Sequence, residues 1–321
     1  MSASHPRRVL IVRFSSLGDV ILTTPLLRAL RRAYPALDIT FATKAAYAPL
    51  LTDHPHVTRV VALAPGESVI HFARRLTPVA YDRCLDLHGS LRSLALRALL
   101  PGHWTGYSKR RLARAALIHL GLGGGPGTPV AERYFHAARG LGVRLDGGPA
   151  EVHWSPAADA TARAMAPDGC VVLAPGAQHA TKRWPRAHWQ ELAAGLVAAG
   201  HSVAVTGAAH EREPYPGGVI DMFGVQLPVA AALMARSRAV VANDSGLLHL
   251  GTAVGARVIA LYGPTVPALG FGPYHADAVV LETALACRPC SARGGASCPR
   301  GHHRCLTAIA PSAVRAAIAA A

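Results

Sequence analysis

The chain has 321 residues, of which 51% are hydrophobic, 16% charged and 6% aromatic. This length and apolar content exclude a disordered chain and are sufficient for two ordinary hydrophobic cores. Lysine and arginine number 33 against 18 acidic residues, a formal net charge of +15, which points to an anionic partner: nucleic acid, phosphate, nucleotide or an acidic membrane face.

The positive charge is concentrated in the first half of the chain, where residues 1–155 have a net charge of +11 against +4 for residues 156–321. The apolar run 9–12 is interrupted by Arg13, whereas a signal-peptide core needs roughly 7 to 15 apolar residues. No stretch approaches the roughly 20 apolar residues of a membrane span. We therefore expect a cytoplasmic protein, either free or resting on the inner face of the cytoplasmic membrane.

In the first half, residues 9–14 predict a strand, Gly18 a tight turn, and residues 20–33 a helix that Pro35 ends. Further strands are predicted at 39–42, 57–63 and 83–87, each separated from the next by helical or loop segments. This alternation is typical of a parallel doubly wound sheet. We place the end of this first domain near Ser155.

A second alternating series follows, with strands at 170–174, 202–206, 239–243 and 258–262 and helices at 185–199, 228–235 and 247–254. The sequence therefore predicts an α/β fold with two Rossmann-like domains, residues 1–155 and 156–321. In open α/β sheets ligands bind beyond the carboxyl ends of the strands, so the functional residues are expected just after each strand.

Three of these junctions hold polar side chains. The first contains Ser15, Ser16, Gly18 and Asp19, where Asp19 is either a reactive carboxylate or a simple helix cap. The second delivers Thr181 and Lys182 to the start of a helix that begins at Pro185, which suits a phosphate but also describes a solvated basic loop. The third is Asp244, Ser245 and Gly246, with His249 one turn into the helix; Asp244 as a plain cap is the alternative.

The chain resembles the lipopolysaccharide heptosyltransferases of glycosyltransferase family 9. The resemblance rests on VLIVRFSSLGDVILTTPLLRALR, YDRCLDLHGSLRS, WTGYSKR, APGA, TKRWPRAHWQEL, VANDSGLLHL, LYGPT and a cysteine-rich tail, in that order. It implies the GT-B fold, two Rossmann-like domains facing a cleft. Residues 1–155 would then be the acceptor side, and residues 156–321 would bind the nucleotide sugar.

The resemblance also implies the chemistry. Asp19 would be the general base, with Ser15, Ser16 and Gly18 forming its loop. Lys182 and Thr181 would hold the donor diphosphate, and Asp244, Ser245, Gly246 and His249 the donor sugar and phosphates. Such an enzyme moves a heptose from an ADP-sugar to an anionic glycolipid such as the lipopolysaccharide inner core, with inversion. No acidic metal motif of the DxD type stands out, so we expect transfer without a metal or other cofactor, and no specific nucleic-acid partner.

The sequence departs from the family in places. Residues 207–218 are too short for a full crossover helix, which leaves Glu211, at the family's ribose-binding position, as either a donor contact or a loop carboxylate. His88 stands where glutamine is more common, and is either an acceptor contact or a hydrogen-bonded loop residue. Lys109, Arg110 and Arg111 form the densest basic run, facing an anionic acceptor or lipid headgroups, or simply solvent on a helical face.

The tail contains Cys287, Cys290, Cys298 and Cys305, whose spacing only partly fits a structural zinc site; reduced thiols in a compact loop are the alternative. Two rival functions stay open. A non-catalytic nucleic-acid-binding protein would explain the charge, and an idle GT-B protein would bind a sugar nucleotide only as a sensor. The first would be indifferent to loss of Asp19, and the second would bind donor without transferring it.

Overall fold

A computed structural model describes residues 6–122 and 127–320 of the chain. They form two compact units, residues 6–109 with 130–153, and residues 110–122 and 127–129 with 154–320. Residues 110–122 and 127–129, which were expected in the first domain, thus belong to the second unit. The reason lies in the contacts of Arg114, which donates to the carbonyl of Ala292 at 2.8 Å and stacks over the ring of Phe271 at 5.7 Å.

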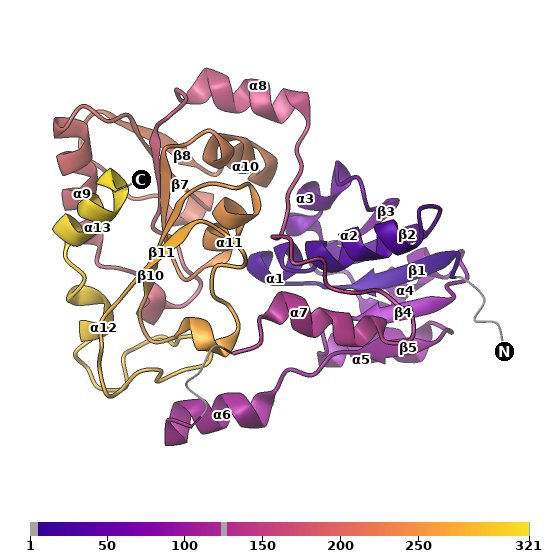
Figure 1. Ribbon diagram of the computed structural model, residues 1–321. Coiled ribbons are helices and arrows are strands. Elements are labelled where there is room, and N and C mark those ends of the chain that lie inside the picture. Colours follow the sequence, from indigo (N-terminus) through magenta and orange to yellow (C-terminus); the bar gives the residue numbers. More distant parts are fainter. Residues whose placement is uncertain (1–5, 123–126, 321) are drawn as a thin grey trace. The chain divides into compact units, whose positions relative to one another are not determined.

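The first unit is built on a five-stranded parallel sheet in the order β3-β2-β1-β4-β5 (Figure 1). The paired strands are all in parallel register. Its elements are β1 (Arg8–Val12), α1 (Leu17–Ile21), α2 (Thr24–Ala33), β2 (Asp38–Lys44), α3 (Pro49–Thr52), β3 (Arg59–Leu63), α4 (Val69–Leu76), β4 (Arg83–Asp86), α5 (Leu91–Leu99), β5 (Trp104–Gly106) and α7 (Val130–Tyr134).

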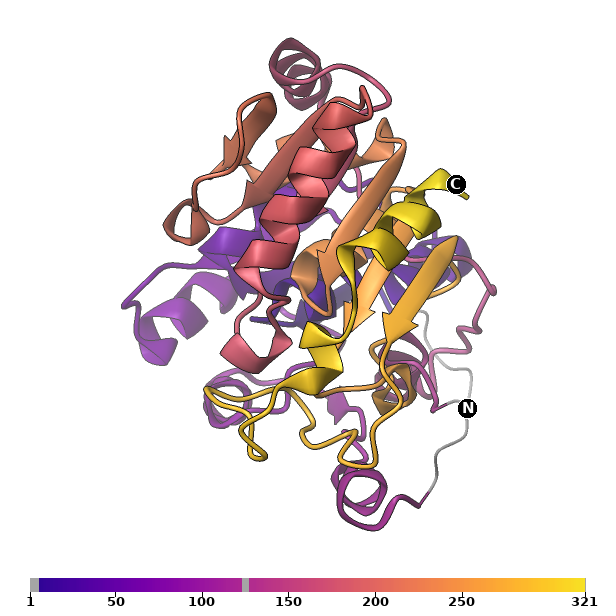
Figure 2. The same ribbon diagram turned by 90° about the vertical axis from the view of Figure 1, so that its left-hand side faces the viewer.

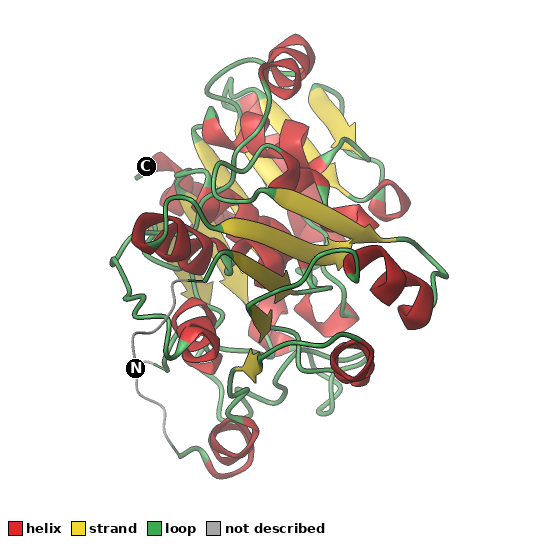
Figure 3. Ribbon diagram, turned by 90° about the vertical axis from the view of Figure 1, so that its right-hand side faces the viewer, coloured by secondary structure: helices red, strands yellow, loops and turns green. Residues whose placement is uncertain are grey.

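One face of this sheet packs on α4 and α5. Leu10, Val12 and Phe14 from the β1 region meet Phe72 of α4 and Leu96 of α5 in a single buried cluster. Phe14 and Phe72 pack edge to face with ring centroids 5.7 Å apart. Figure 3 shows the strands of this unit in yellow with helices on both sides, so both faces of the sheet are covered, as parallel sheets require.

The helix predicted over residues 20–33 is interrupted, and this corrects the sequence-based boundary. It begins earlier, at Leu17, and breaks between Ile21 and Thr24. The hydroxyls of Thr23 and Thr24 donate to the carbonyls of Val20 and Ile21 at 2.7 and 2.8 Å, and Pro25 has no N–H to continue the ladder. The short α1 is therefore separate from the longer α2.

The second unit is built on a six-stranded parallel sheet in the order β11-β10-β9-β6-β7-β8. Its elements are α6 (Arg111–Leu120), α8 (Pro156–Met165), β6 (Val171–Ala174), α9 (Arg186–Ala198), β7 (Val203–Gly207), β8 (Val219–Phe223), α10 (Leu227–Ala235), β9 (Ala239–Asn243), α11 (Gly246–Ala253), β10 (Val258–Tyr262), β11 (Ala278–Glu282), α12 (Arg304–Thr307) and α13 (Pro311–Ala319).

Helices α9 and α13 lie side by side over one face of the second sheet (Figure 2). Trp184 and Trp189, both almost fully buried, pack edge to face with ring centroids 5.0 Å apart. The indole N–H of Trp184 donates to the carbonyl of Ile309 at 2.9 Å, which ties the chain before α13 to the start of α9. Val314 and Ile318 of α13 complete this core.

The predicted α/β class with two doubly wound parallel sheets is confirmed by this topology. The predicted loss of the helix after β7 is also seen, because only the 3₁₀ turn Ala209–Glu211 lies between β7 and β8. No strand was given from the sequence for β5, β8 or β11, which are three of the four edge strands of the two sheets. None of the helices in residues 6–122 and 127–320 is long and apolar enough to cross a bilayer.

Candidate active site

Asp19 lies in the first turn of α1, just after the chain leaves β1. Its Oδ1 is 2.6 Å from Nη2 of Arg13, and the two side chains are only 13% and 7% exposed. This ion pair is therefore largely removed from water. Dissolved salt screens such a buried pair much less than it would an exposed one. The same burial means that neither charge can be removed alone without leaving the other uncompensated.

Both carboxylate oxygens of Asp19 have further donors. Ser16 donates to Oδ2 from its N–H at 3.1 Å and from its hydroxyl at 2.6 Å, and Tyr134 donates to Oδ1 at 3.2 Å. Burial acts to raise the pKa of Asp19, but the charge of Arg13 and the Ser16 hydrogen bonds outweigh it, so the pKa lies below its ordinary value. Asp19 is thus ionised at neutral pH, the state in which it can accept a proton.

Arg13 is fixed by two other segments. Its Nη1 donates to the carbonyl of Leu87, after β4, and to the hydroxyl of Tyr107, after β5, at 3.3 Å. The Tyr134 ring of α7 lies 5.7 Å from the guanidinium carbon and packs against Tyr107 with ring centroids 4.8 Å apart. Segments from β1, β4, β5 and α7 therefore meet around Asp19 at the carboxyl edge of the first sheet, where open α/β sheets bind ligands.

The loop after β4 is shaped by a second buried carboxylate, Asp86. It accepts from the N–H groups of His88 and Gly89 at 2.9 and 2.8 Å and from the Ser93 hydroxyl at 2.9 Å. His88 packs edge to face on Phe14, with ring centroids 5.3 Å apart. Burial, aided by the positive charges of Arg13 and Lys109, lowers the pKa of His88 to about 4. Its imidazole is therefore neutral at physiological pH.

The basic run at 109–111 does not lie on one helical face. Lys109 belongs to the first unit, where its Nζ donates to the carbonyl of Gly89 at 2.9 Å. Arg110 precedes α6 with a φ of 47°, and its Nη1 donates to the Thr128 hydroxyl at 3.0 Å. Only Arg111 is part of the helix, and it is exposed. The three cations therefore have different surroundings.

In the second unit, Lys182 ends the 3₁₀ turn Ala180–Lys182 that follows β6. Its Nζ lies 2.6 Å from Oδ2 of Asp244, with side-chain exposures of 15% and 7%. Thr265, after β10, donates its hydroxyl to the same oxygen at 2.5 Å. The loops after β6, β9 and β10 thus meet at Asp244, on the carboxyl edge of the second sheet, where the sequence analysis expected them.

Thr181, predicted beside Lys182 at a phosphate, joins two loops. Its hydroxyl accepts from the N–H of Gly295 at 2.8 Å and donates to the Gly295 carbonyl at 3.1 Å. The Thr181 carbonyl is 2.8 Å from Nε2 of His303. These contacts hold the cysteine-rich tail against the turn that presents Lys182.

The start of α11 is set by the last residue of β9. The Asn243 amide donates to the carbonyl of Pro175 at 2.6 Å and accepts from the N–H of Trp184 at 3.1 Å. This fixes the β9 loop to the β6 loop from both sides. Asn243 lies in the motif VANDSGLLHL, but its position in the motif did not indicate this role.

Ser245 and Gly246 lie where the backbone N–H groups of α11 are free of intrahelical partners. Ser245 is the N-cap, and its buried hydroxyl oxygen has no hydrogen-bond partner within residues 6–122 and 127–320. His249 is 4% exposed, one turn further along the helix. A helix start with N–H groups and a hydroxyl is suited to an anion.

Glu211 closes the 3₁₀ turn after β7, and its Oε2 accepts from the N–H of Ala208 at 3.0 Å. A Cβ atom added at Gly176, in the loop after β6, would lie only 2.3 Å from that oxygen. The absence of a side chain at Gly176 therefore lets the Glu211 carboxylate lie against the β6 loop. The shortened crossover brings Glu211 to the same edge of the sheet as Lys182.

The four tail cysteines are all free thiols, and among the described residues no three of their sulfur atoms come within ligand distance of one another. Cys287 has its sulfur 3.9 Å from Nε2 of His302. Burial, the largest influence, raises the pKa of Cys290 and Cys305. This arrangement fits the alternative of reduced thiols in a compact loop.

Two residues that contact Asp19, Arg13 and Tyr134, were not predicted as site residues. A charged residue directly after a buried strand is unusual, so the position of Arg13 could have indicated a functional role, but the sequence does not show that its partner is Asp19. The position of Tyr134 gives no such indication, because it lies 115 residues from Asp19 and no spacing rule connects them. Tertiary structure alone brings these groups together.

Comparisons with known proteins identify the family of this chain. The profile described as "Glycosyltransferase family 9 (heptosyltransferase)" matches residues 69–297. Lipopolysaccharide heptosyltransferase 1 of Pseudomonas aeruginosa is 31% identical, over 88% of this chain and 86% of that protein.

Solved structures extend the likeness to nearly the whole chain. The Escherichia coli ADP-heptose lipopolysaccharide heptosyltransferase II has a TM-score of 0.75 and 25% identity, with 98% of each chain covered. An Escherichia coli heptosyltransferase with ADP has a TM-score of 0.73 and 25% identity, covering 98% of this chain and 99% of that one. The predicted GT-B class is thereby confirmed.

Proposed function

The chain belongs to glycosyltransferase family 9, and on that premise we propose that it moves a heptose, or a related sugar, from an ADP-sugar to an acidic glycolipid such as the lipopolysaccharide inner core. The observation that carries this proposal is the pair of buried ionic clusters, Asp19 with Arg13 and Lys182 with Asp244. Sugar transfer needs a base for the acceptor and a cation for the leaving group.

In the proposed reaction Asp19 accepts the proton of an acceptor hydroxyl while that oxygen bonds to the anomeric carbon. The bond from the anomeric carbon to the phosphate oxygen breaks at the same time, and ADP leaves with the electron pair. A single displacement of this kind inverts the anomeric configuration. Arg13, fixed by Leu87 and Tyr107, keeps the carboxylate ionised and oriented.

Lys182 neutralises the charge that develops on the departing diphosphate. The N–H groups at the start of α11 and the Ser245 hydroxyl add hydrogen-bond donors and a positive helix end. We propose that these protein groups take the place that a metal ion has in other enzymes, so that transfer proceeds without a metal. Asp244, Gly246 and His249, together with Thr181, would shape the rest of the donor subsite.

Glu211 is proposed as the contact to the ribose of the donor. Its carboxylate rests against Gly176 and has a second oxygen with which to accept from a sugar hydroxyl. A carboxylate beyond a neighbouring strand has this task in other Rossmann-like nucleotide sites.

The acceptor side is proposed to be the loop that holds His88 and Lys109. Lys109 lies against Gly89, and its charge adds to burial and to the charge of Arg13 in lowering the pKa of His88. A cation beside a neutral imidazole suits an acceptor with phosphate or carboxylate groups and hydroxyls. Arg110 and Arg111 would extend this preference for anionic acceptors.

Helix α6 is proposed as the contact with an anionic membrane surface, which would place the enzyme at the inner face of the cytoplasmic membrane. Leu112 and Leu120 are 87% and 68% exposed, and Leu122 just beyond the helix is 60% exposed. Arg111 is exposed on the same helix. Apolar side chains next to arginines are typical of helices that lie in a membrane interface.

Substituting Leu112→Glu with Leu120→Glu is expected to weaken binding to vesicles of anionic lipid by about 100-fold, roughly ten-fold for each leucine that loses its burial. Cosedimentation with vesicles measures this. Met165→Glu, on α8 and 40% exposed, is the control and should leave binding unchanged. Equal binding of the double variant and the parent would remove α6 from the proposal.

The whole function is tested by mass spectrometry of the products formed from ADP-heptose and truncated lipopolysaccharide cores. We expect the acceptor to gain the mass of one heptose unit while ADP is released. ADP-heptose binding without transfer to any acceptor would favour the idle sensor. Tight, salt-sensitive binding of DNA or RNA without transfer would favour the nucleic-acid-binding alternative.

A further inference from the structure

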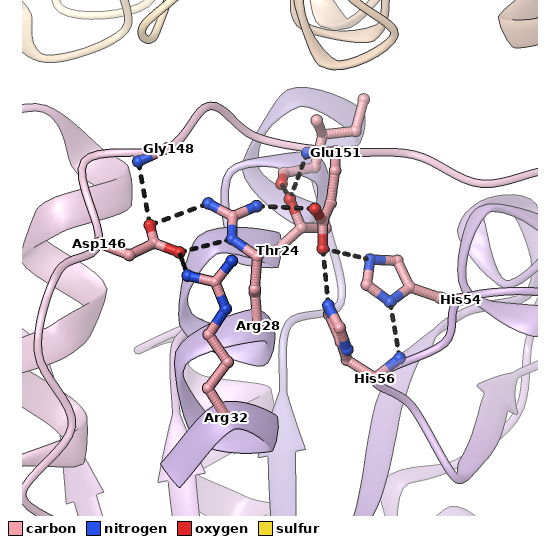
Figure 4. Close-up of polar contacts among 9 residues, drawn as sticks. Thr24, Arg28, Arg32, His54, His56, Asp146, Gly148 and Glu151 are labelled. Carbon is pink, nitrogen blue, oxygen red and sulfur yellow. Dashed lines mark hydrogen bonds and ion pairs between the residues drawn. The ribbon is translucent and has the colours of Figure 1, made fainter.

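A cluster of histidines and one carboxylate lies in the first unit, among residues that the proposed reaction does not use. His54 follows α3, and Glu151 and His153 belong to the stretch that leads out of this unit. We call these three residues the histidine cluster. Figure 4 shows His54 and Glu151 facing each other, with His56 beside them.

The three side chains are arranged as ligands. One ligand atom from each of them lies within 4.8 Å of the other two. The imidazole rings of His54 and His153 have centroids 5.0 Å apart and planes at 80°. Donors of a tetrahedral zinc site, at bond lengths of about 2.0 to 2.2 Å, lie about 3.4 Å apart, so binding of an ion would draw these three donors closer together through small side-chain movements.

The cluster leaves buried polar atoms unsatisfied. The His54 side chain is 0% exposed. Its Nε2 and that of His153 have no hydrogen-bond partner within residues 6–122 and 127–320. Buried polar atoms nearly always have partners, so two unpartnered ring nitrogens in one cluster call for an explanation.

Arg28 orients the carboxylate of the cluster. Its Nη1 lies 2.7 Å from Oε2 of Glu151, and its other nitrogens hold Asp146 at 2.7 and 3.0 Å. With Oε2 engaged, Oε1 is left for the histidines: it is 3.9 Å from Nε2 of His54 and 3.0 Å from Nε2 of His56. An outer group that fixes a ligand in this way is usual at metal sites.

We propose that the histidine cluster binds a divalent cation of the zinc class through His54, Glu151 and His153. Two imidazoles and a carboxylate are a ligand set that zinc accepts, with a fourth position left for His56 or solvent. The Nδ1 atom of His54 accepts from the His56 N–H at 3.3 Å, so the ring proton is on Nε2. On binding, that proton moves to Nδ1 and this long hydrogen bond is lost in exchange for the metal bond.

The bound ion would join two parts of the first unit that are far apart in sequence. The loop after α3 supplies His54, and the exit segment supplies Glu151 and His153. His153 is the last residue of the first unit. The ion would therefore fasten the end of this unit to its body, a structural task separate from catalysis.

The test uses the full chain, stripped of metal with a chelator and titrated with Zn²⁺ and Co²⁺. We expect one Zn²⁺ per chain and a Co²⁺ visible spectrum without the thiolate charge-transfer band that the tail cysteines would produce. His153→Ala should weaken Zn²⁺ binding by about 100-fold or more, since even the loss of an outer-sphere partner costs 10 to 100-fold. Zn²⁺ should raise the Tm of the parent protein but not that of the variant.

Glu151→Gln is the second variant, because it retains an oxygen for Arg28 while losing the charge that favours the ion; it too should bind Zn²⁺ more weakly. His119→Ala, an exposed histidine on α6, should bind as the parent does. Binding that is unchanged in His153→Ala, or Co²⁺ spectra with thiolate bands alone, would overturn the proposal. None of these readouts depends on sugar transfer.

Discussion

We expect the Asp19→Asn enzyme to lose about 10³-fold in kcat, in the middle of the range for removal of a general base. Asparagine keeps the shape of the side chain but cannot accept the proton of the acceptor hydroxyl. Under the proposed roles the donor binds to the second unit, so the dissociation constant for ADP should not change. Rates of heptose transfer and calorimetric binding of ADP measure the two effects separately.

The variant also leaves the Arg13 guanidinium buried without its counterion, and losing one partner of such a pair typically costs about 3 to 5 kcal/mol of stability. The double variant Arg13→Met with Asp19→Asn removes both charges and should recover much of that stability without recovering the rate. Asp53→Asn, an exposed carboxylate of the same unit, is the control. Transfer by the double variant at a rate near that of the parent would exclude Asp19 as the base.

The second large effect is expected for Lys182→Met, which should lower kcat by about 10² to 10³-fold, the usual loss when a group that stabilises transition-state charge is removed. Lys182 is also expected to hold the diphosphate before reaction. The KM for the ADP-sugar and the dissociation constant of ADP should therefore rise as well, and both can be measured by steady-state kinetics and calorimetry.

Two controls separate this effect from loss of folding. The double variant Lys182→Met with Asp244→Asn removes both charges of the buried ion pair. It should therefore fold even if the single variant Lys182→Met is destabilised. Arg186→Met removes an exposed cation of the same unit that pairs with Glu213 and should leave ADP binding unchanged. If Lys182→Met bound ADP and transferred sugar as the parent does, the diphosphate would have to be held elsewhere.

The fold was largely predictable because alternating apolar strands and amphipathic helices are local patterns. The helix boundary near residue 22 and the unit to which α6 belongs differ from the prediction, because other contacts outweigh the local pattern there. Thr23, Thr24 and Pro25 broke a continuous leucine-rich helix through hydrogen bonds that the periodicity of the leucines does not reveal. Helix α6 belongs to the second unit because Arg114 contacts Ala292 and Phe271, which lie more than 150 positions away in the sequence.

The candidate site was predictable in part, for a similar reason. Asp19 follows a strand of the first parallel sheet, and Lys182 and Asp244 follow strands of the second; each sheet collects such residues at its carboxyl edge. The partners of these residues were not predictable. Tyr134 and Thr265 reach Asp19 and Asp244 from other elements, and no spacing in the sequence records that approach.

Under the proposed roles, the Lys182–Asp244 pair means that the cation which receives the diphosphate already has an anionic partner. The ammonium group lies 2.6 Å from a carboxylate and is largely removed from water, so a donor does not have to dehydrate a free lysine. It has to replace one negative partner by another. Under the proposed roles, a diphosphate gains from this replacement because it brings more charge than a carboxylate, whereas a sugar monophosphate gains less and an uncharged sugar nothing. Asp244 would thus compete with ligands for Lys182, and ligands of low charge would bind there only weakly.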